Sequence, residues 1–393
     1  MSLRLLFVGI LSYLSFSASA QTNNPIVQPV INLPRDSIVS AQLIASLDSF
    51  LTLKGRPNGE NNFVWQNELV ETFVLLDEMK EVDKNEKLKD NHFYKPYLMD
   101  VVKLNDSIYA VKLSYIGMKE NAPLFRASFN LVAHRQYNQF LFSSPLKRNT
   151  STWQTKKMGN CLFHYKHALN NAEAVKYKNT VSFFDKKLQA PEQETEIYCC
   201  DDFPEVLETM GIDYSLVYNG YNANTNLGSQ TARKKVLLNA SAGGGFNYFD
   251  PHDLWHDRLH RVASTDSINK PVDEGCAFLY GGSWGMSWKE IQEKFNEKFP
   301  NNTDSTDWLK LFDEQYNFGD SEMKRLRMNY FLNALIVQDL EKTKGFAPVL
   351  QLLTCGKYEK DNGNYFKMLD KLTGINRANF NKAIAGIINK SRR

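Results

Sequence analysis

After its first twenty residues, the sequence has no apolar run long enough to cross a bilayer as a helix. Its net charge is also small. The formal value is +3, and no basic cluster is interleaved with aromatic residues, which disfavours nucleic acid and anionic membranes as partners. The five cysteines are scattered, and none shows the C-x-x-C spacing of a metal knuckle or a redox pair. These absences predict a soluble globular chain.

The one long apolar segment is the N-terminal stretch MSLRLLFVGILSYLSFSASA. Arg4 supplies a positive charge, residues 5–16 an apolar core and residues 18–20 a small-residue cleavage site, which together are typical of a secretory signal peptide. A membrane anchor is the alternative, but the stretch is short for a span and ends in a cleavage pattern. We therefore expect cleavage after Ala20 and a secreted or periplasmic protein with no membrane span in the mature chain.

Export would place the cysteines where disulfides can form. An odd count leaves at least one of them free. Their scattered positions, with Cys199 and Cys200 adjacent and facing opposite ways in a strand, predict small core residues rather than a disulfide framework.

Residues 21–150 have the pattern of a small α+β domain. A segment with helical periodicity begins behind Asp36 and ends near Lys54. Four β-branched and aromatic runs separated by turn residues follow, and they predict an antiparallel meander: YLMDVVKL, IYAVKLSYIG, PLFRASFNLVAHR and NQFLFSSPL. No residue in this part has a catalytic spacing, so its role is left open.

Residues 151–393 are organised differently, and they predict a second domain. Strands are expected at NCLFHYKH, ETEIYCCD, YSLVYNGYN and KKVLLNAS. One helix is expected between the first and second of these strands, and another between the second and third. From residue 321 onward the periodicity is mostly helical.

The most informative stretch is DPHDLWHDRLHRV, residues 250–262, in which three histidines follow one another at intervals of four. Asp250 can cap a helix and Pro251 suits its first position. Two imidazoles one turn apart can bind one zinc ion, but His252 and His260 lie two turns, roughly 12 Å, apart. At most one adjacent pair can therefore bind a single ion, and the remaining histidine is a bystander or an outer-shell group.

A zinc site also needs a third ligand, commonly a carboxylate. Glu274 lies in PVDEGCAFLYGG, which predicts a helix that begins near Pro271. A helix that runs back beside the histidine helix would bring Glu274 to His256 and His260, so these three residues are the predicted metal ligands. The alternative is a helix with incidental histidines, because an isolated HxxxH pair occurs by chance in many helices.

HDRLH and DEG resemble the motifs of the gluzincins, zinc metallopeptidases of the peptidase MA-like kind. In that family HExxH is followed by a helix that bears a glutamate ligand. The order of predicted elements across residues 155–393 also resembles the family. The resemblance implies a zincin-like domain with a small mixed sheet, an active-site helix and a helical C-terminal lobe.

The resemblance further implies that Zn²⁺ is bound by His256, His260 and Glu274. Asp257 stands at the position of the general base, where the family has a glutamate. Since aspartate is one methylene shorter, its carboxylate can lose contact with the attacking water, at a cost on the order of 10²–10⁴ in rate.

Three further roles follow from the resemblance alone. Tyr280 would donate a hydrogen bond to the oxyanion of a tetrahedral intermediate, or else be a core tyrosine. Asp273 would orient a histidine, or cap the helix of Glu274. The strand at residues 234–241 would present an edge to an extended peptide.

The sequence thus predicts an α+β protein with a small N-terminal domain and a zincin-like domain. The predicted function is an exported zinc metallopeptidase acting on a peptide or protein substrate. The alternative is a catalytically impaired protein of the same fold that binds an envelope component or a partner, and a third reading is an exported helical protein with no metal.

Overall fold

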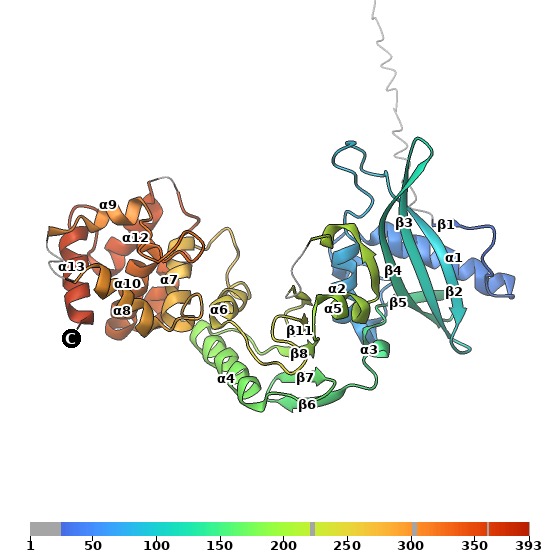
Figure 1. Ribbon diagram of the computed structural model, residues 1–393, viewed down its shortest axis with the longest axis horizontal. Coiled ribbons are helices and arrows are strands. Elements are labelled where there is room, and N and C mark those ends of the chain that lie inside the picture. Colours follow the sequence, from blue (N-terminus) through green and yellow to red (C-terminus); the bar gives the residue numbers. More distant parts are fainter. Residues whose placement is uncertain (1–24, 221–224, 301–304, 360, 393) are drawn as a thin grey trace, which may run out of the picture. The chain divides into compact units, whose positions relative to one another are not determined.

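The structure, a computed structural model, describes residues 25–220, 225–300, 305–359 and 361–392 (Figure 1). The chain forms two compact units. The first contains the chain up to Pro145 together with Gly211–Val217, and the second contains Leu146–Met210 and Tyr218–Arg393. The predicted signal peptide lies outside the described residues. In the described ranges, no helix combines the length and the hydropathy needed to cross a membrane.

The first unit is built on a six-stranded sheet in the order β1-β2-β3-β4-β5, with β9 also paired to β4. Only β1 is parallel to its neighbour, and β2 to β5 form the predicted antiparallel meander. The strands are β1 (Ile26–Val27), β2 (Lys95–Lys103), β3 (Ile108–Lys119), β4 (Ala122–Gln136), β5 (Gln139–Ser143) and β9 (Ile212–Ser215).

Two helices, α1 (Ser37–Leu53) and α2 (Leu69–Met79), pack against β5. The side chain of Asp36 caps α1 by accepting from Ile38 N at 2.9 Å, which confirms the predicted helix start. Ser46 of α1 accepts a hydrogen bond from Phe140 N, so a buried hydroxyl fixes the helix to the strand. Short 3₁₀ turns lie at Asn58–Glu60 and Gln66–Glu68.

The second unit contains a five-stranded mixed sheet in the order β10-β11-β8-β7-β6. The three inner strands are parallel to one another, and the two outer strands are antiparallel to their neighbours. The strands are β6 (Gln154–Met158), β7 (Cys161–Tyr165), β8 (Glu194–Cys199), β10 (Leu227–Gln230) and β11 (Lys234–Asn239). The chain is therefore α+β with mixed sheets, as predicted.

Helices form the rest of this unit, and those from α7 onward gather around α10 (Figure 1). They are α3 (Leu146–Asn149), α4 (Asn171–Leu188), α5 (Phe203–Met210), α6 (Pro251–Leu259), α7 (Lys270–Gly281), α8 (Trp288–Lys298), α9 (Trp308–Asp313), α10 (Met328–Lys344), α11 (Phe346–Leu353), α12 (Gly363–Thr373) and α13 (Phe380–Ser391). One hydrophobic core runs from the sheet through α4 and α6 into this helical lobe.

Two glycines let the helices next to α7 approach it closely. A Cβ on Gly275 would lie 2.7 Å from Asn333 Cβ of α10, and a Cβ on Gly281 would lie 2.5 Å from His252 N of α6. Real Cβ atoms do not come so near, so any larger residue would push α7 away from α10 or α6. The packing of α6 against α7 therefore depends on Gly281, and that of α10 against α7 depends on Gly275.

The strand predicted at residues 214–222 is wrong over residues 216–220, and residues 221 and 222 lie outside the described part of the chain. Strand β9 ends at Ser215, and a 3₁₀ turn follows at Leu216–Tyr218. The strand also pairs with β4 rather than with the second sheet. The length of β9 is set by this long-range pairing, which local residue preferences do not predict. The first unit thus contains a returning segment that a single boundary at residue 150 does not include.

All five cysteines are free thiols. Cys161, Cys199, Cys200 and Cys276 are buried, in agreement with the prediction of small core residues, and Cys355 is partly exposed. Burial raises the pKa of the Cys161 thiol to about 11, so it is protonated at neutral pH.

Candidate metal centre

Helix α6 carries the histidines and begins where the sequence predicts. The Asp250 side chain accepts a hydrogen bond from His252 N at 2.8 Å, and Pro251 occupies the first turn. His252 and His256 lie one turn apart and face the same side, with ring centroids 4.9 Å from each other.

Helix α7 returns antiparallel to α6, as predicted, and its polar groups hold both histidine rings. The Asp273 carboxylate lies 2.9 and 3.0 Å from His256 Nδ1 and also accepts from Trp255 Nε1 at 3.0 Å. At the other end of α7, His252 Nδ1 lies 2.7 Å from the carbonyl oxygen of Gly282. Asp273 therefore orients a histidine, which is the first of its two predicted roles. It does not cap α7, because Asn269 occupies the N-cap position of that helix.

These contacts fix the tautomer of each ring. A carboxylate and a carbonyl oxygen can only accept, so Nδ1 of both His252 and His256 must carry the hydrogen. The lone pair of each neutral ring is then on Nε2. Imidazoles that ligate metals in proteins are held in this way, with the second nitrogen bonded to a carboxylate or a carbonyl.

His252, His256 and Glu274 form a group that could hold a metal ion, since one potential ligand atom from each lies within 4.8 Å of the others. His252 Nε2 is 3.5 Å from Glu274 Oε2. All three side chains are partly buried, with those of His252 and Glu274 exposed by 14% and 18%. Two imidazole nitrogens and one carboxylate oxygen are a donor set that suits zinc and other first-row divalent ions.

The electrostatics of the group favour a positive charge at its centre. Burial opposes the charged form of His252, but the hydrogen bonds to Glu274 and to the Gly282 carbonyl outweigh it, and its pKa is raised. Burial likewise opposes the charged form of Glu274, yet the contact with His252 and the nearby His256 keep the pKa of the carboxyl below its ordinary value.

The predicted ligand His260 lies outside this group. It is exposed, and it caps the C-terminal end of α6. Because α6 and α7 are antiparallel, moving one turn along α6 from His256 leads toward Asn269, where α7 begins, and away from Glu274. The fold therefore pairs His256 with His252, the alternative pair that the spacing allows.

The predicted base Asp257 also lies outside the group. Its carboxylate accepts from Lys235 Nζ of β11 at 2.5 Å, so it is engaged on another side of α6. The observed pair, His252 and His256, lies one turn before the predicted pair. The residue that directly follows its first histidine is therefore Asp253. The sequence contains the same H-D-x-x-H pattern twice, at residues 252–256 and 256–260. This repetition is the signal that could have pointed to the pair of His252 and His256.

Asp253 is exposed and lies within the electrostatic reach of the whole group. Its pKa is raised, first by partial burial of the carboxylate and then by the negative charge of Asp250. His252 and His256 act in the opposite direction, while Glu274 acts with Asp250. In the described ranges Asp253 has no ion-pair partner, in contrast to Asp257.

Tyr280, predicted to bind an oxyanion, is used elsewhere. Its hydroxyl donates to Glu341 Oε2 of α10 at 2.6 Å, and Lys187 Nζ of α4 lies 4.4 Å from its ring centroid. Burial and the contact with Glu341 raise its pKa. The tyrosine therefore belongs to the packing of α7 against α4 and α10, which is the second of its two predicted roles.

A cavity of about 450 Å³ opens beside His252 and Glu274. Tyr330 of α10 lines it together with three cationic side chains, Lys270, Arg325 and Arg327, of which Arg325 is paired with Glu322 at 3.0 Å. Arg327 Nη1 lies 3.4 Å from the Tyr330 hydroxyl, and its guanidinium carbon lies 5.6 Å from the centre of that ring. Sequence reasoning missed these residues, because nothing in their spacing relates them to the histidine helix.

The opposite face of α6 is fixed by Arg258, of which 1% is exposed. Its Nε and Nη2 donate to the two carboxylate oxygens of Asp185 at 2.7 Å each, and its Nη1 donates to Gln193 at 3.0 Å. Asp185 lies on α4, so a buried bidentate ion pair holds α6 against α4 while the histidines face the other way.

The predicted substrate edge at residues 234–241 is wrong. Strand β11 lies between β10 and β8, so both of its edges are already paired. On this side of the sheet, β10 is the outermost strand.

The arrangement as a whole satisfies the requirements of a divalent metal site: three convergent donors, fixed tautomers and a partly buried pocket. Comparison with models of known protein families, with curated proteins and with solved structures finds no match for this chain. Any function must therefore be argued from the site itself.

Proposed function

We propose that His252, His256 and Glu274 bind Zn²⁺ and that the protein is an exported metal-dependent hydrolase of peptide bonds, similar to the gluzincins. The observation that carries the proposal is the convergence of the three side chains, with both Nδ1 atoms engaged by Gly282 and Asp273. A zinc ion bound by three protein ligands acts as a Lewis acid and lowers the pKa of a bound water toward 7.

In this proposal Asp253 is the general base. It follows the first histidine directly, as the glutamate does in HExxH, and it has no competing ion pair in the described ranges. Its carboxylate accepts a proton from the attacking water and returns it to the leaving amine.

The cavity beside the group contributes to substrate binding. Lys270 and Arg327 have no ion-pair partner in the described part of the chain, and both border the cavity that contains His252 and Glu274. They can bind a carboxylate of the substrate, and the Tyr330 hydroxyl is placed to donate to a second oxygen. This favours a peptide that carries a negative charge near the bond to be cleaved.

A catalytically impaired metal protein that binds a partner is the second candidate. It is favoured by one observation, the aspartate in place of a glutamate at the base position. The shorter side chain draws the carboxylate back by one methylene, which can cost on the order of 10²–10⁴ in rate.

Metal content tests the binding site. We expect zinc at one equivalent in wild-type protein, measured by mass spectrometry after extensive dialysis. His252→Ala and Glu274→Gln should lose it, whereas His260→Ala, on the same helix, should retain it. Loss of zinc from His260→Ala and not from His252→Ala would show that the sequence-based ligand set was right after all.

Activity separates the two candidate functions. The zinc-loaded protein is incubated with a peptide library, and cleavage is followed by mass spectrometry. Cleavage that falls by about 10²–10⁴ in Asp253→Asn, with zinc retained, supports the hydrolase. If the wild-type protein binds zinc but cleaves no peptide, and the Asp253→Glu variant cleaves none either, the catalytically impaired protein is supported.

A further inference from the structure

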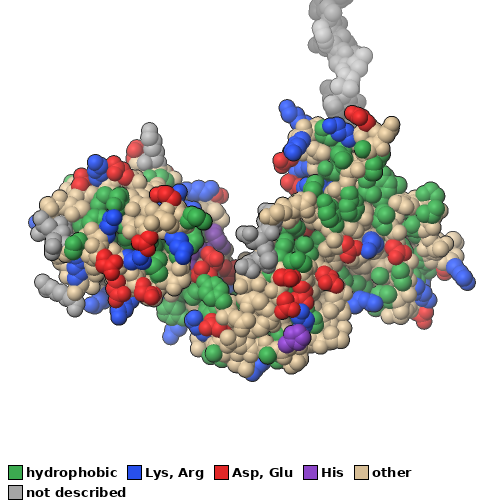
Figure 2. Space-filling model, viewed as in Figure 1, with side chains coloured by type: hydrophobic (Ala, Val, Ile, Leu, Met, Phe, Trp, Pro, Cys, Tyr) green, Lys and Arg blue, Asp and Glu red, His purple; other side chains and the backbone are tan. Residues whose placement is uncertain are grey.

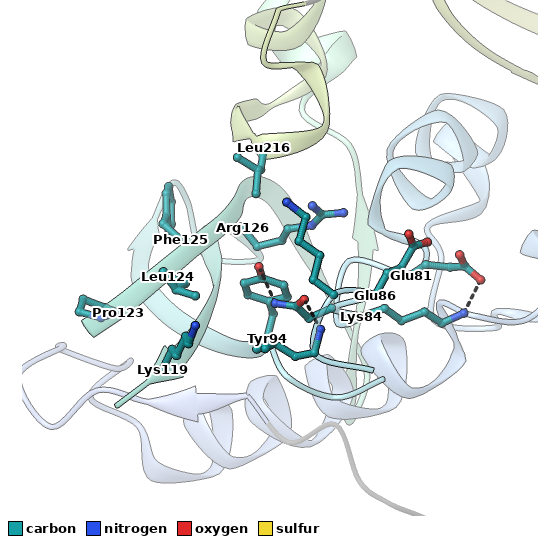
Figure 3. A pocket seen from close by; sticks show the side chains of 13 residues that line it. Glu81, Lys84, Glu86, Tyr94, Lys119, Pro123, Leu124, Phe125, Arg126 and Leu216 are labelled. Atoms are coloured by element: carbon teal, nitrogen blue, oxygen red, sulfur yellow. Dashed lines mark hydrogen bonds and ion pairs between the residues drawn. The ribbon is translucent and has the colours of Figure 1, made fainter. Parts of the chain in front are cut away.

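The first unit contains a second cavity, of about 670 Å³, that has no part in the metal centre (Figure 3). It lies between the segment at residues 81–88, which follows α2, and the beginning of β4, with Leu216 from the turn after β9 at its margin. Tyr94 lies inside it, and its hydroxyl accepts a hydrogen bond from Asn85 Nδ2 at 3.3 Å.

Arg126 points into this cavity because of a β-bulge (Figure 3). Tyr115 of β3 pairs with Ala127 of β4 and Ile116 pairs with Phe125, so Arg126 is the extra residue between them. A bulge re-aims a side chain relative to the regular alternation of a strand, and bulges are frequent next to binding sites.

The guanidinium of Arg126 lacks the partner that its position calls for. Its Nε is buried and donates no hydrogen bond. Its guanidinium carbon lies 5.7 Å from the ring centroid of Tyr94, and in the described ranges no carboxylate pairs with it. A buried charged donor without an acceptor is costly, so this group is arranged to receive one from outside the chain.

Cationic side chains outnumber acidic ones around the cavity. Lys87 and Lys119 border it, and neither has an ion pair within the described chain. Of the two glutamates at its margin, Glu81 is paired with Lys84 at 2.5 Å. The cavity therefore has an excess of positive charge around Arg126.

The remaining wall is apolar and unusually exposed. Phe125 and Leu88 are each 43% exposed and Leu216 is 36% exposed. Figure 2 shows hydrophobic side chains gathered on this surface near the β3–β4 hairpin. A ligand that covers them must itself carry an apolar group.

We propose that this cavity binds a small amphipathic carboxylate, with its anionic head on Arg126 and its aromatic or alkyl body on Phe125, Leu88 and Leu216. The planar guanidinium matches a carboxylate and can bind it with two parallel hydrogen bonds. Lys87 and Lys119 add attraction without fixed geometry. The site is independent of the metal centre, and it gives a ligand-binding role to a unit in which sequence reasoning finds none.

The test uses 4-phenylbutyrate and its neutral analogue 4-phenylbutanamide, titrated into the full chain and followed by ligand-observed NMR. We expect the acid to bind the wild-type protein at least about tenfold more tightly than the amide. Arg126→Gln should remove this preference. Arg135→Gln, which makes the same change on an exposed position of β4 away from the cavity, should preserve it.

Equal affinity for acid and amide in the wild-type protein, or no binding of either, would overturn the proposal. So would a preference for the acid that survives Arg126→Gln. The amide NMR spectrum of each variant shows whether it is folded. If Arg126→Gln does not fold, Lys87→Gln combined with Lys119→Gln replaces it, and this double variant should bind the acid several-fold more weakly while its affinity for the amide is unchanged.

Discussion

Replacement of Asp273 by asparagine tests whether this carboxylate prepares His256 for the proposed zinc ion. The carboxylate of Asp273 accepts from both His256 Nδ1 and Trp255 Nε1, and the residue is only 7% exposed. Asparagine has the same shape but a single acceptor oxygen. If that oxygen serves Trp255, the amide nitrogen faces His256 and favours a hydrogen on Nε2, the atom that should ligate the metal.

The expected loss follows from this change of tautomer. Mutations of groups that orient metal-bound histidines typically weaken metal affinity 10–100-fold, which is about 1.4–2.7 kcal/mol. We therefore expect Asp273→Asn to raise the zinc dissociation constant by that factor. Asp257→Asn is the matched control, because it removes the same charge from a residue adjacent to His256 whose carboxylate is bonded to Lys235. It should change zinc affinity by no more than about twofold.

The assay is competition with a chromophoric zinc chelator at fixed pH, with urea unfolding of the metal-free proteins to show that each variant is folded. Nitrogen-15 NMR of the metal-free Asp273→Asn protein should show the hydrogen of His256 on Nε2. Zinc affinity equal to that of the wild type, or a loss as large in Asp257→Asn, would refute the idea that Asp273 positions this ligand.

Three further predictions concern catalysis and stability. Asp253→Glu should raise peptide hydrolysis by at least about tenfold with zinc retained, because the longer side chain brings the carboxylate nearer the water; an unchanged rate would argue against Asp253 as the base. Arg258→Met should lower the free energy of unfolding by about 3 kcal/mol in urea, because it removes the bidentate partner of the partly buried Asp185 carboxylate and leaves only the Arg261 contact at 3.4 Å, and Arg258→Met with Asp185→Leu should recover part of the loss. Burial lowers the pKa of His134 to about 4, so between pH 6.5 and 4 the unfolded chain binds a proton that the folded one does not, and stability should fall as the pH falls through this range. His134→Gln should flatten that dependence in unfolding experiments, and an unchanged slope would contradict the assignment to His134.

Much of the fold could be predicted from residue patterns that act over short distances. The meander from β2 to β5 follows from alternating apolar residues between turns, and α1 and α6 follow from aspartate caps. The pairing of β9 with β4 could not be predicted, because it joins residues far apart in the chain. The segment Gly211–Val217 belongs to the first unit, although the residues before and after it belong to the second. Strands β6 and β10 were missed as well, since they are short edge strands rich in polar residues.

The sequence by itself determined that α6 begins at Pro251, that its histidines lie on one face, and that Glu274 sits on a returning helix, because caps and helical periodicity act within a few residues. Only the tertiary structure decided which of the two overlapping H-D-x-x-H patterns meets Glu274. That choice depends on the register of α7 along α6, and Gly281 contributes to this register because it lets α7 approach the backbone of His252, which is remote from it in sequence. A shift of one turn replaces His260 with His252 and Asp257 with Asp253, while the local pattern stays the same.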